Sequence, residues 1–290
     1  MSKKNINKLC IIGVGLIGGS LARALKKAGA VREVVGCGRD VAHLEKAKAL
    51  GVIDFFETDI SLAVKDCDMV VVAVPLGAMQ SVFEKIAPVI TDDMVITDVG
   101  SAKESVVKAA NAAFNTIPKT LVPGHPIAGT EKSGVEASFA ELYENRRVII
   151  TPLETSSSDA VSKVNSMWQA CGAEVVETTI EHHDKVLAAT SHLPHMLAFS
   201  LVDTLSKMDA KSEIFDFAAG GFRDFTRIAS SDPDMWRDIC LANGDALVEM
   251  IKKFVDDLQQ LSSAIENNDS GYLKETFSRA KKSRDEFCDT

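Results

Sequence analysis

The sequence predicts an α/β protein in which an N-terminal, Rossmann-type doubly wound sheet is followed by an all-helical domain. Two observations lead to this prediction. Over the first half of the chain, short apolar strand-like segments alternate with helical ones, which is typical of a parallel sheet covered on both faces. The second half has helical periodicity and few strand signals. Because 290 residues exceed one ordinary core, we expect two domains, residues 1–178 and 179–290.

Apolar runs and helix-stop signals place the elements of the first domain. The first strand ends at glycines, a helix follows over residues 16–25, and a second helix over residues 40–50 is closed by Gly51. A buried strand over residues 69–74 is ended by Pro75. Further strands are expected at residues 34–37, 94–98, 120–122, 148–151 and 174–177, and further helices at residues 78–86 and 103–114. Ligands of such sheets bind at the carboxyl ends of the strands.

The first strand–helix junction carries the most informative motif of the chain. An apolar run leads directly into Gly13, Gly15 and Gly18, which are spaced G-x-G-x-x-G. Gly13 allows the tight turn, Gly15 lets the backbone approach a pyrophosphate, and Gly18 lets helix and strand pack closely. The helix N-terminus offers free N–H groups to the anion. We therefore expect NAD+ or NADP+ to bind here, and the expected cofactor-binding residues are Gly13, Gly15, Leu16, Ile17, Gly18, Arg39, Val74 and Pro75.

The second half of the chain reads as helices from about residue 180 to residue 287. Pro194 lies inside the first of them and is expected to kink it. Ser231, Asp232 and Pro233 form a helix start, with a capping side chain before a proline. The long amphipathic pattern over residues 247–265 exceeds what one small domain buries alone, so we expect a homodimer.

Charge and composition argue against a nucleic-acid-binding, membrane-spanning, secreted or metal-binding protein. The net charge is −9, which argues against nucleic acid as a partner. No apolar segment reaches the length of a membrane helix, and glycines interrupt the apolar N-terminal run, which argues against a signal peptide. The six cysteines contain no C-x-x-C pair, which predicts reduced thiols in a cytoplasm. His192 and His195 have metal-ligand spacing, but no carboxylate pattern completes a set, so no metal is expected.

Two histidine-containing segments are candidates for catalysis. His125 follows a predicted strand and Ser101 follows the preceding one, so both are expected at the cofactor side of the sheet. A dehydrogenase needs a group that removes a proton from the substrate hydroxyl, and histidine is well suited to that task. In the helix that begins near residue 181, Asp184, Ser191 and His195 share one face and are expected to line a substrate pocket. On the same helix we expect His182 and His183 to be solvated.

The segment 220–227 mixes glycines, aromatic residues and two arginines. An arginine on a small-residue loop is suited to bidentate capture of a carboxylate. We assign that role to Arg227, although a surface salt bridge is the alternative for both Arg227 and Arg223.

These motifs together resemble the prephenate/arogenate (cyclohexadienyl) dehydrogenase family of tyrosine biosynthesis. The resemblance runs from about residue 9 to residue 265. It implies a nucleotide-binding domain joined to a dimeric helical domain. It also implies oxidation of the C4 hydroxyl of prephenate by NAD(P)+, with loss of the ring carboxylate as CO2. The blocks that carry it are residues 13–18, 98–101, 124–130, 191–195, 221–227 and 232–237.

The resemblance also implies roles for individual residues. His125 would draw off the proton of the C4 hydroxyl, Ser101 would orient that hydroxyl, and Arg227 would bind a substrate carboxylate. His195 would contact the substrate side chain. The pocket would be surrounded by Thr130, Glu131, Asp184, Ser191, Asp224 and Trp236, the last of them from the partner subunit. The sequence leaves open whether prephenate or arogenate is preferred, and what Glu131 does. It also leaves open whether tyrosine inhibits at the active site.

One departure from the pattern concerns the cofactor. NAD-selective folds place an acidic residue about 20 positions after the last fingerprint glycine, where this chain has Gly38 followed by Arg39. Asp40 is close by, but it is expected to cap the next helix. We therefore expect NADP+ to be accepted. No regulatory domain is expected after the helical domain, and no chorismate mutase helices are expected before the first strand.

Two rival functions differ in the residues that they require. A β-hydroxyacid dehydrogenase shares the two-domain plan but needs a catalytic lysine followed by asparagine at Lys-x-x-x-Asn spacing. Lys185 is the candidate, and Ala189 occupies the asparagine position. A dinucleotide-sensing regulatory protein would need neither a proton acceptor nor a carboxylate clamp, yet His125 and Arg227 are both present.

Overall fold

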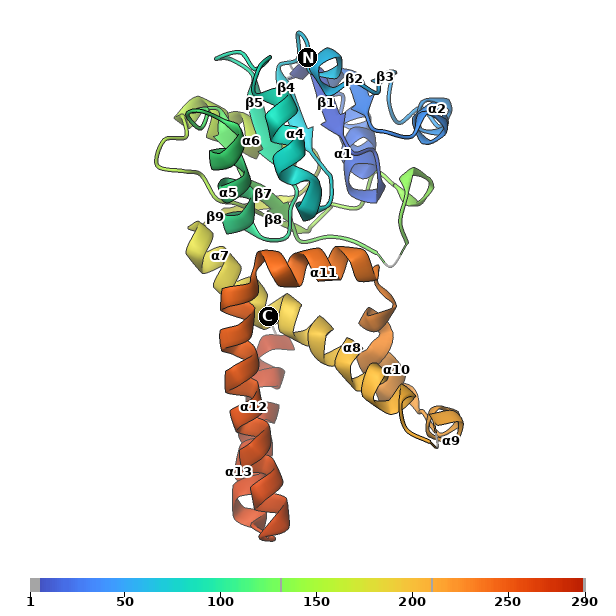
Figure 1. The fold of residues 1–290 in the computed structure, drawn as a ribbon, viewed down its shortest axis with the longest axis vertical. Coiled ribbons are helices and arrows are strands. Elements are labelled where there is room, and N and C mark those ends of the chain that lie inside the picture. The colour runs from blue at the N-terminus through green and yellow to red at the C-terminus, as the bar shows by residue number, and fades with distance from the viewer. Residues whose placement is uncertain (1–5, 131, 210, 289–290) are drawn as a thin grey trace. The chain divides into compact units, whose positions relative to one another are not determined.

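The computed structural model describes residues 6–130, 132–209 and 211–288, so Glu131 lies outside the described residues. Six parallel strands form the main sheet in the order β3-β2-β1-β4-β5-β6 (Figure 1). They are β1 (Ile6–Ile12), β2 (Val31–Cys37), β3 (Phe55–Glu57), β4 (Met69–Val72), β5 (Val95–Asp98) and β6 (Leu121–Val122). The strand order reverses beside β1, which is the switch point where such sheets bind ligands. The predicted Rossmann-type fold is confirmed.

Helices cover both faces of this sheet because its strands are apolar on both sides. Leu9 and Ile11 of β1 belong to one buried cluster, and the alternate residues Cys10 and Ile12 belong to another. This alternation follows from the two-residue period of a strand. The helical segments of this part are α1 (Leu16–Lys27), α2 (Val41–Ala49), α3 (Ile60–Ala63), η1 (Leu76–Ala78), α4 (Met79–Ile86), α5 (Lys103–Ala113), η2 (Val135–Ala137) and α6 (Ser158–Ala170).

A second, three-stranded sheet corrects one part of the prediction. Its strands are β7 (Gly124–Pro126), β8 (Arg147–Ile150) and β9 (Glu174–Glu177), in that order. β7 runs antiparallel to β8, and β8 runs parallel to β9. The segments expected at 148–151 and 174–177 are therefore strands, but they do not join the parallel sheet. Pro123, which has no N–H for a ladder hydrogen bond, separates β6 from β7 and accepts a hydrogen bond from Thr151 N.

The chain is helical from α7 onward, as predicted. A π-helical turn, η3, joins α7 to α8 without a break, and Pro194 is the second residue of α8. Prolines and π-helical turns are both places where helices bend, and the kink expected at Pro194 stays a prediction. Asp232 caps α11 by accepting from Met235 N at 2.9 Å. The segments are α7 (Ile180–Leu187), η3 (Ala188–His192), α8 (Leu193–Ser206), α9 (Lys211–Asp216), α10 (Gly220–Thr226), η4 (Arg227–Ser230), α11 (Pro233–Ala242), α12 (Gly244–Glu266) and α13 (Ser270–Cys288).

Internal contacts divide the chain into two compact units, residues 1–244 and 245–290. The first contains both sheets together with α7 to α11. The second is the predicted long amphipathic helix α12 with α13, joined within the unit by Tyr272 Oη donating to Gln260 at 2.9 Å. The domain boundary expected at residue 179 does not coincide with this division and stays a prediction. Among the residues that the structure describes, no helix has the length and apolar character to cross a membrane.

Candidate active site

The glycine loop has the geometry of a dinucleotide-binding turn. Gly13 has φ +98°, and a Cβ there would lie 2.2 Å from the carbonyl oxygen of Ala73. A Cβ at Gly18 would lie 2.3 Å from the Gly13 oxygen. At Gly15, no atom of the described residues lies within 4 Å of the Cβ position. Gly13 and Gly18 are therefore required by close backbone contacts within the protein. Gly15 instead leaves open space beside the backbone, as a bound pyrophosphate requires.

The first turn of α1 completes this cradle. Leu16 and Ile17 are half-buried there, and the helix has no side-chain N-cap. Its first N–H groups can therefore donate to phosphate oxygens. Val74 and Pro75 follow β4 next to Ala73, so they lie at the same carboxyl edge of the sheet.

The end of β2 lies beside this loop. Arg39 is exposed, and Asp40 caps α2 by accepting from His43 N at 3.2 Å, which confirms the expected cap. The His43 ring donates from Nε2 to the Val14 carbonyl at 2.7 Å and so ties α2 to the glycine loop. Asp40 therefore caps its own helix, and Arg39 is an exposed charged side chain next to it.

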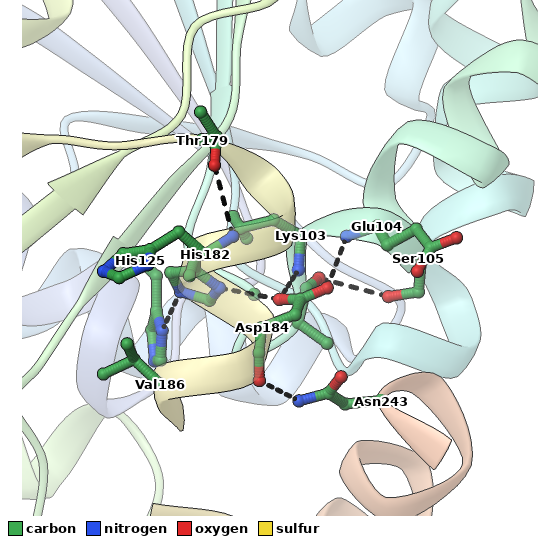
Figure 2. Close-up of polar contacts among 12 residues, drawn as sticks. Lys103, Glu104, Ser105, His125, Thr179, His182, Asp184, Val186 and Asn243 are labelled. Atoms are coloured by element: carbon green, nitrogen blue, oxygen red, sulfur yellow. Dashed lines mark hydrogen bonds and ion pairs between the residues drawn. The ribbon is translucent and has the colours of Figure 1, made fainter. Parts of the chain in front are cut away.

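Two histidines and a carboxylate form a hydrogen-bonded chain. Nδ1 of His125 lies 2.9 Å from Nε2 of His183, and Nδ1 of His183 lies 2.7 Å from Oδ1 of Asp184 (Figure 2). His125 is 9% exposed, His183 is fully buried and Asp184 is 4% exposed. The expectation that His183 is solvated is wrong. It is buried because α7 packs against α5 and the His183 ring meets His125 of β7, which sequence periodicity within one helix does not reveal.

Asp184 also caps a helix that is distant in sequence. Helix α5 has no side-chain cap from its own N-cap residue, Ala102. Instead, Lys103 N and Glu104 N donate to the Asp184 carboxylate at 2.8 and 2.9 Å. The carboxylate expected to border the substrate pocket is thus engaged by backbone amides and by His183. A carboxylate at a helix N-terminus is favourable because of the helix dipole.

A buried ion pair supports the strand that carries His125. Nζ of Lys103 lies 2.5 Å from Asp98 Oδ2 and 2.5 Å from the carbonyl oxygen of Gly124, and Lys103 and Asp98 are both fully buried. The other Asp98 oxygen accepts from Gly124 N at 3.1 Å. Because both backbone groups of Gly124 are held, the residue that follows it, His125, has a fixed position.

Burial dominates the protonation of this cluster. Burial, followed by the charge of Lys103, holds the pKa of His125 well below its usual range. Burial also lowers the pKa of His183, although the hydrogen bond that its ring donates to Asp184 acts in the opposite direction. Burial raises the pKa of Asp184, but its hydrogen bonds with His183 and with the amides of Lys103 and Glu104 outweigh that effect and lower it. Both imidazoles are therefore neutral and Asp184 is ionised near neutral pH.

Asn243 connects α11 to the same cluster. Its Nδ2 donates to the Asp184 carbonyl at 2.8 Å and lies 3.1 Å from Nδ1 of His192. Burial lowers the pKa of His192 to about 4. Because the neutral His192 ring accepts at Nδ1, its Nε2 carries the proton, and this buried atom has no partner among the described residues.

A second group of side chains lies on α8, α11 and η4. The rings of His195 and Trp236 are stacked with centroids 3.7 Å apart. Burial lowers the pKa of His195, and the nearby charge of Arg227 contributes in the same direction. Trp236 therefore contacts His195 of its own chain, whereas the family resemblance implied that Trp236 enters the pocket from the partner subunit. The carbonyl of Ser191 accepts from the His195 ring at 2.9 Å.

The remaining predicted residues are spread around these groups. Ser101 is half-buried just before α5, and Thr130 is exposed and bonds locally to Lys132. Asp224 is exposed on α10. The segment 220–227 is helix α10 followed by the start of η4, so its assignment as a loop was wrong.

Sequence patterns did not predict the roles of four buried residues in this region. Lys103 was expected only as the first residue of a helix, His183 was expected to be solvated, and no role was expected for Asn243. One signal in the sequence could have indicated the role of Lys103. This lysine lies at a strand–helix junction and is followed by an apolar residue at i+3, and a buried lysine is destabilising unless a carboxylate pairs with it. His192 was considered only as a metal ligand, and no metal-binding cluster is found within residues 6–130, 132–209 and 211–288.

Comparison with known proteins identifies the family of this chain. Residues 21–177 match the prephenate dehydrogenase nucleotide-binding domain, and residues 179–279 match the prephenate dehydrogenase dimerization domain. The chain belongs to the prephenate dehydrogenase family. It is an oxidoreductase, and the family's reaction is the NAD-dependent oxidation of prephenate.

Individual prephenate dehydrogenase relatives extend over nearly the whole chain. A cyclohexadienyl dehydrogenase of Zymomonas mobilis is 39% identical over 95% of this chain and 94% of its own length. A prephenate dehydrogenase of Bacillus subtilis is 37% identical over 96% of this chain and 75% of its own. Among solved structures, the A. aeolicus prephenate dehydrogenase in complex with hydroxyphenyl propionate and NAD+ has a TM-score of 0.91 and 37% identity, and covers 97% of this chain and 98% of its own.

Proposed function

We propose that this chain oxidises and decarboxylates prephenate with His125 as the proton acceptor. The observation that carries the proposal is the buried, neutral His125, held at its Nδ1 side by His183, on a strand whose backbone is fixed by Lys103. A neutral imidazole has one lone pair available for a hydroxyl proton. Ser101, next to the start of α5, is proposed to orient the same hydroxyl.

The chain's residues handle the proton while the substrate rearranges. The glycine loop and the first turn of α1 would hold NAD(P)+, whose oxidised nicotinamide would supply the acceptor for the hydride of C4. His125 Nε2 takes the C4 hydroxyl proton as the hydride leaves. The ring carboxylate departs as CO2, and the electron pair of the broken C–C bond makes the ring aromatic. His125 then returns its proton to the C4 oxygen, so the protein ends the cycle in its starting protonation state.

The substrate carboxylates require cationic and donor groups. We assign one carboxylate to Arg227, whose charge acts on His195, and the substrate side chain to His195 and Trp236. Thr130, Ser191 and Asp224 are proposed to line the pocket, while Asp184 acts through His183. Arogenate carries an ammonium group where prephenate has a keto group, so parallel kinetics with both substrates distinguish the two preferences.

NADP+ is proposed as an accepted cofactor beside NAD+. Asp40 is engaged as a helix cap, and the exposed Arg39 stands where an acid would bind the ribose of NAD. A 2′-phosphate would therefore meet a positive rather than a negative side chain. Comparable rates with NADP+ and NAD+ in the unmodified protein are the expected result.

Assembly and location are also proposals. We propose a homodimer, because residues 179–279 match a dimerization domain and because Phe217 and Leu241 are 81% and 76% exposed. Light scattering should then give twice the 31.2 kDa chain mass. The cysteines are free, which supports a reducing cytoplasm, and cell fractionation tests that location.

The central test is the replacement of the proton acceptor. His125→Asn is expected to bind cofactor and to lower kcat about 10²- to 10⁴-fold, the usual range for loss of a general base. Reduced nicotinamide formed from prephenate is measured by its absorbance. His182→Asn, at an exposed neighbouring histidine whose only hydrogen bond in the cluster runs from its backbone N–H, is the matched control. Near-normal turnover by His125→Asn would remove His125 from the mechanism.

A further inference from the structure

We propose that His183 is a positioning residue which, with Asp184, keeps the proton of neutral His125 on Nδ1 and so leaves Nε2 free to act as the base. This inference rests on the proposed function, in which His125 accepts the hydroxyl proton. His183 itself is buried behind His125 and acts on the substrate only through it.

The direction of each hydrogen bond follows from the carboxylate end of the chain. Ionised Asp184 has only acceptor atoms, so Nδ1 of His183, at 2.7 Å, must donate. A neutral imidazole has one N–H, so Nε2 of His183 carries a lone pair. The contact of 2.9 Å between that lone pair and Nδ1 of His125 requires His125 to donate from Nδ1. The remaining nitrogen of His125, Nε2, is then unprotonated.

The Asp184 carboxylate is itself held in place as an acceptor, and for this reason all hydrogen bonds between His125, His183 and Asp184 point towards it. The amides of Lys103 and Glu104 both donate to Asp184, and backbone N–H groups have no alternative protonation state. The Asp184 carboxylate is thus held as an acceptor by helix α5, and Figure 2 shows α5 and α7 meeting at this side chain. Two elements far apart in sequence therefore set the tautomer of a histidine on a third.

The same hydrogen bonds through His183 to Asp184 stabilise His125 when His125 carries the proton taken from the substrate. Protonated His125 still donates from Nδ1 to His183, with the Asp184 charge on the far side of that ring. The groups that face the pair from other elements are Lys103 on α5, Asp98 on β5 and His192 on η3. The charge of Lys103 disfavours protonation of His125, and the hydrogen bonds through His183 to Asp184 oppose this effect. The proton that His125 takes up returns to the C4 oxygen, so the cluster neither gains nor loses a proton over one turnover.

Tautomer populations test the proposal without substrate or cofactor. In protein labelled with 15N-histidine, the His125 resonances are assigned by their absence in His125→Asn. We expect the ring of the unmodified protein to be protonated on Nδ1 at neutral pH, and the Nε2–H form to become populated in His183→Phe, which offers no acceptor. His183→Gln, whose side-chain oxygen can accept, should retain more of the Nδ1–H form. A predominantly Nε2–H ring in the unmodified protein would overturn the proposal.

Kinetics supply the second readout and separate this proposal from the function on which it rests. We expect His183→Phe to lower kcat about 10- to 100-fold, the range for partners that orient a functional histidine, with KM for prephenate changed much less. His183→Gln should recover part of the loss, and His182→Asn should change neither quantity. If His183→Phe does not fold, the tautomer of the unmodified protein and the His183→Gln variant still decide. A folded His183→Phe variant in which the His125 tautomer and kcat are both unchanged contradicts the positioning role of His183. An active His125→Asn variant contradicts the proposed function instead.

Discussion

The glycine loop and the histidine cluster are two regions built in opposite ways. The loop consists of residues 13–18, which are consecutive in sequence, and its geometry comes from backbone contacts such as Gly13 N to the Cys37 carbonyl at 2.8 Å. The cluster consists of side chains from β5, α5, β7, α7 and α11. The loop is fixed by excluded volume, and the cluster is fixed by charge and hydrogen bonding. One region is therefore sensitive to added atoms and the other to lost partners.

The largest effect on stability is expected where a buried charge loses its partner. Lys103→Met removes the ammonium group that compensates Asp98, so unfolding free energy should fall by about 3–5 kcal/mol. The matched control on the same helix is Lys108→Met, which removes an exposed ion pair with Glu104 and should cost at most about 1 kcal/mol. Urea unfolding measures both. Equal effects of the two variants would show that burial of the pair contributes nothing.

The arginine assignment extends the comparison to the substrate. Arg227→Ala should weaken substrate binding by about 2–5 kcal/mol, because a bound carboxylate loses its cation. The KM for cofactor should change little, since the glycine loop is untouched. Arg223→Ala on the same segment is the control, and steady-state kinetics with each substrate varied in turn provide the measurement. If Arg223→Ala shows the large effect instead, the chosen arginine is wrong.

The glycine loop should separate folding from cofactor binding. Gly13→Ala places a Cβ 2.2 Å from the Ala73 oxygen at φ +98°, so we expect a loss of at least about 1–3 kcal/mol of stability from strain. Gly15→Ala meets open space and should keep its stability to within about 0.5 kcal/mol while binding NADH more weakly. Thermal melts and NADH titration check both. Normal NADH binding by Gly15→Ala would place the pyrophosphate elsewhere.

The smallest effect concerns cofactor choice. A Cβ at Gly38 would lie 3.6 Å from Leu44, which is ordinary contact, so Gly38→Asp should fold normally. Its carboxylate should repel a 2′-phosphate and accept from the ribose 2′-OH, which shifts the kcat/KM ratio towards NAD+ about tenfold, or about 1.4 kcal/mol. Gly38→Asn, without the charge, is the control. Strict NAD+ dependence of the unmodified protein would contradict the role given to Arg39.

The predictable features were those with a short sequence range. Continuous apolar strands, the G-x-G-x-x-G turn, the Asp40 and Asp232 caps and the long helix α12 depend on neighbours a few residues apart. Side-chain periodicity, backbone sterics and capping act over that range, so the residues alone determined them. His125 was also found in this way, although the structure places it in the second sheet rather than at the end of a parallel strand.

Only the tertiary structure decided what surrounds His125. Asp184 meets the first amides of α5 across about 80 positions, and Asn243 meets Asp184 across 59. His183 and His182 are adjacent and identical in type, yet one is buried and the other exposed. Burial changes which protonation states and hydrogen bonds a side chain can have, and it depends on which elements pack together. The sequence by itself therefore determined the elements and the candidate proton acceptor, whereas the packing of α5, β7, α7 and α11 decided its partners.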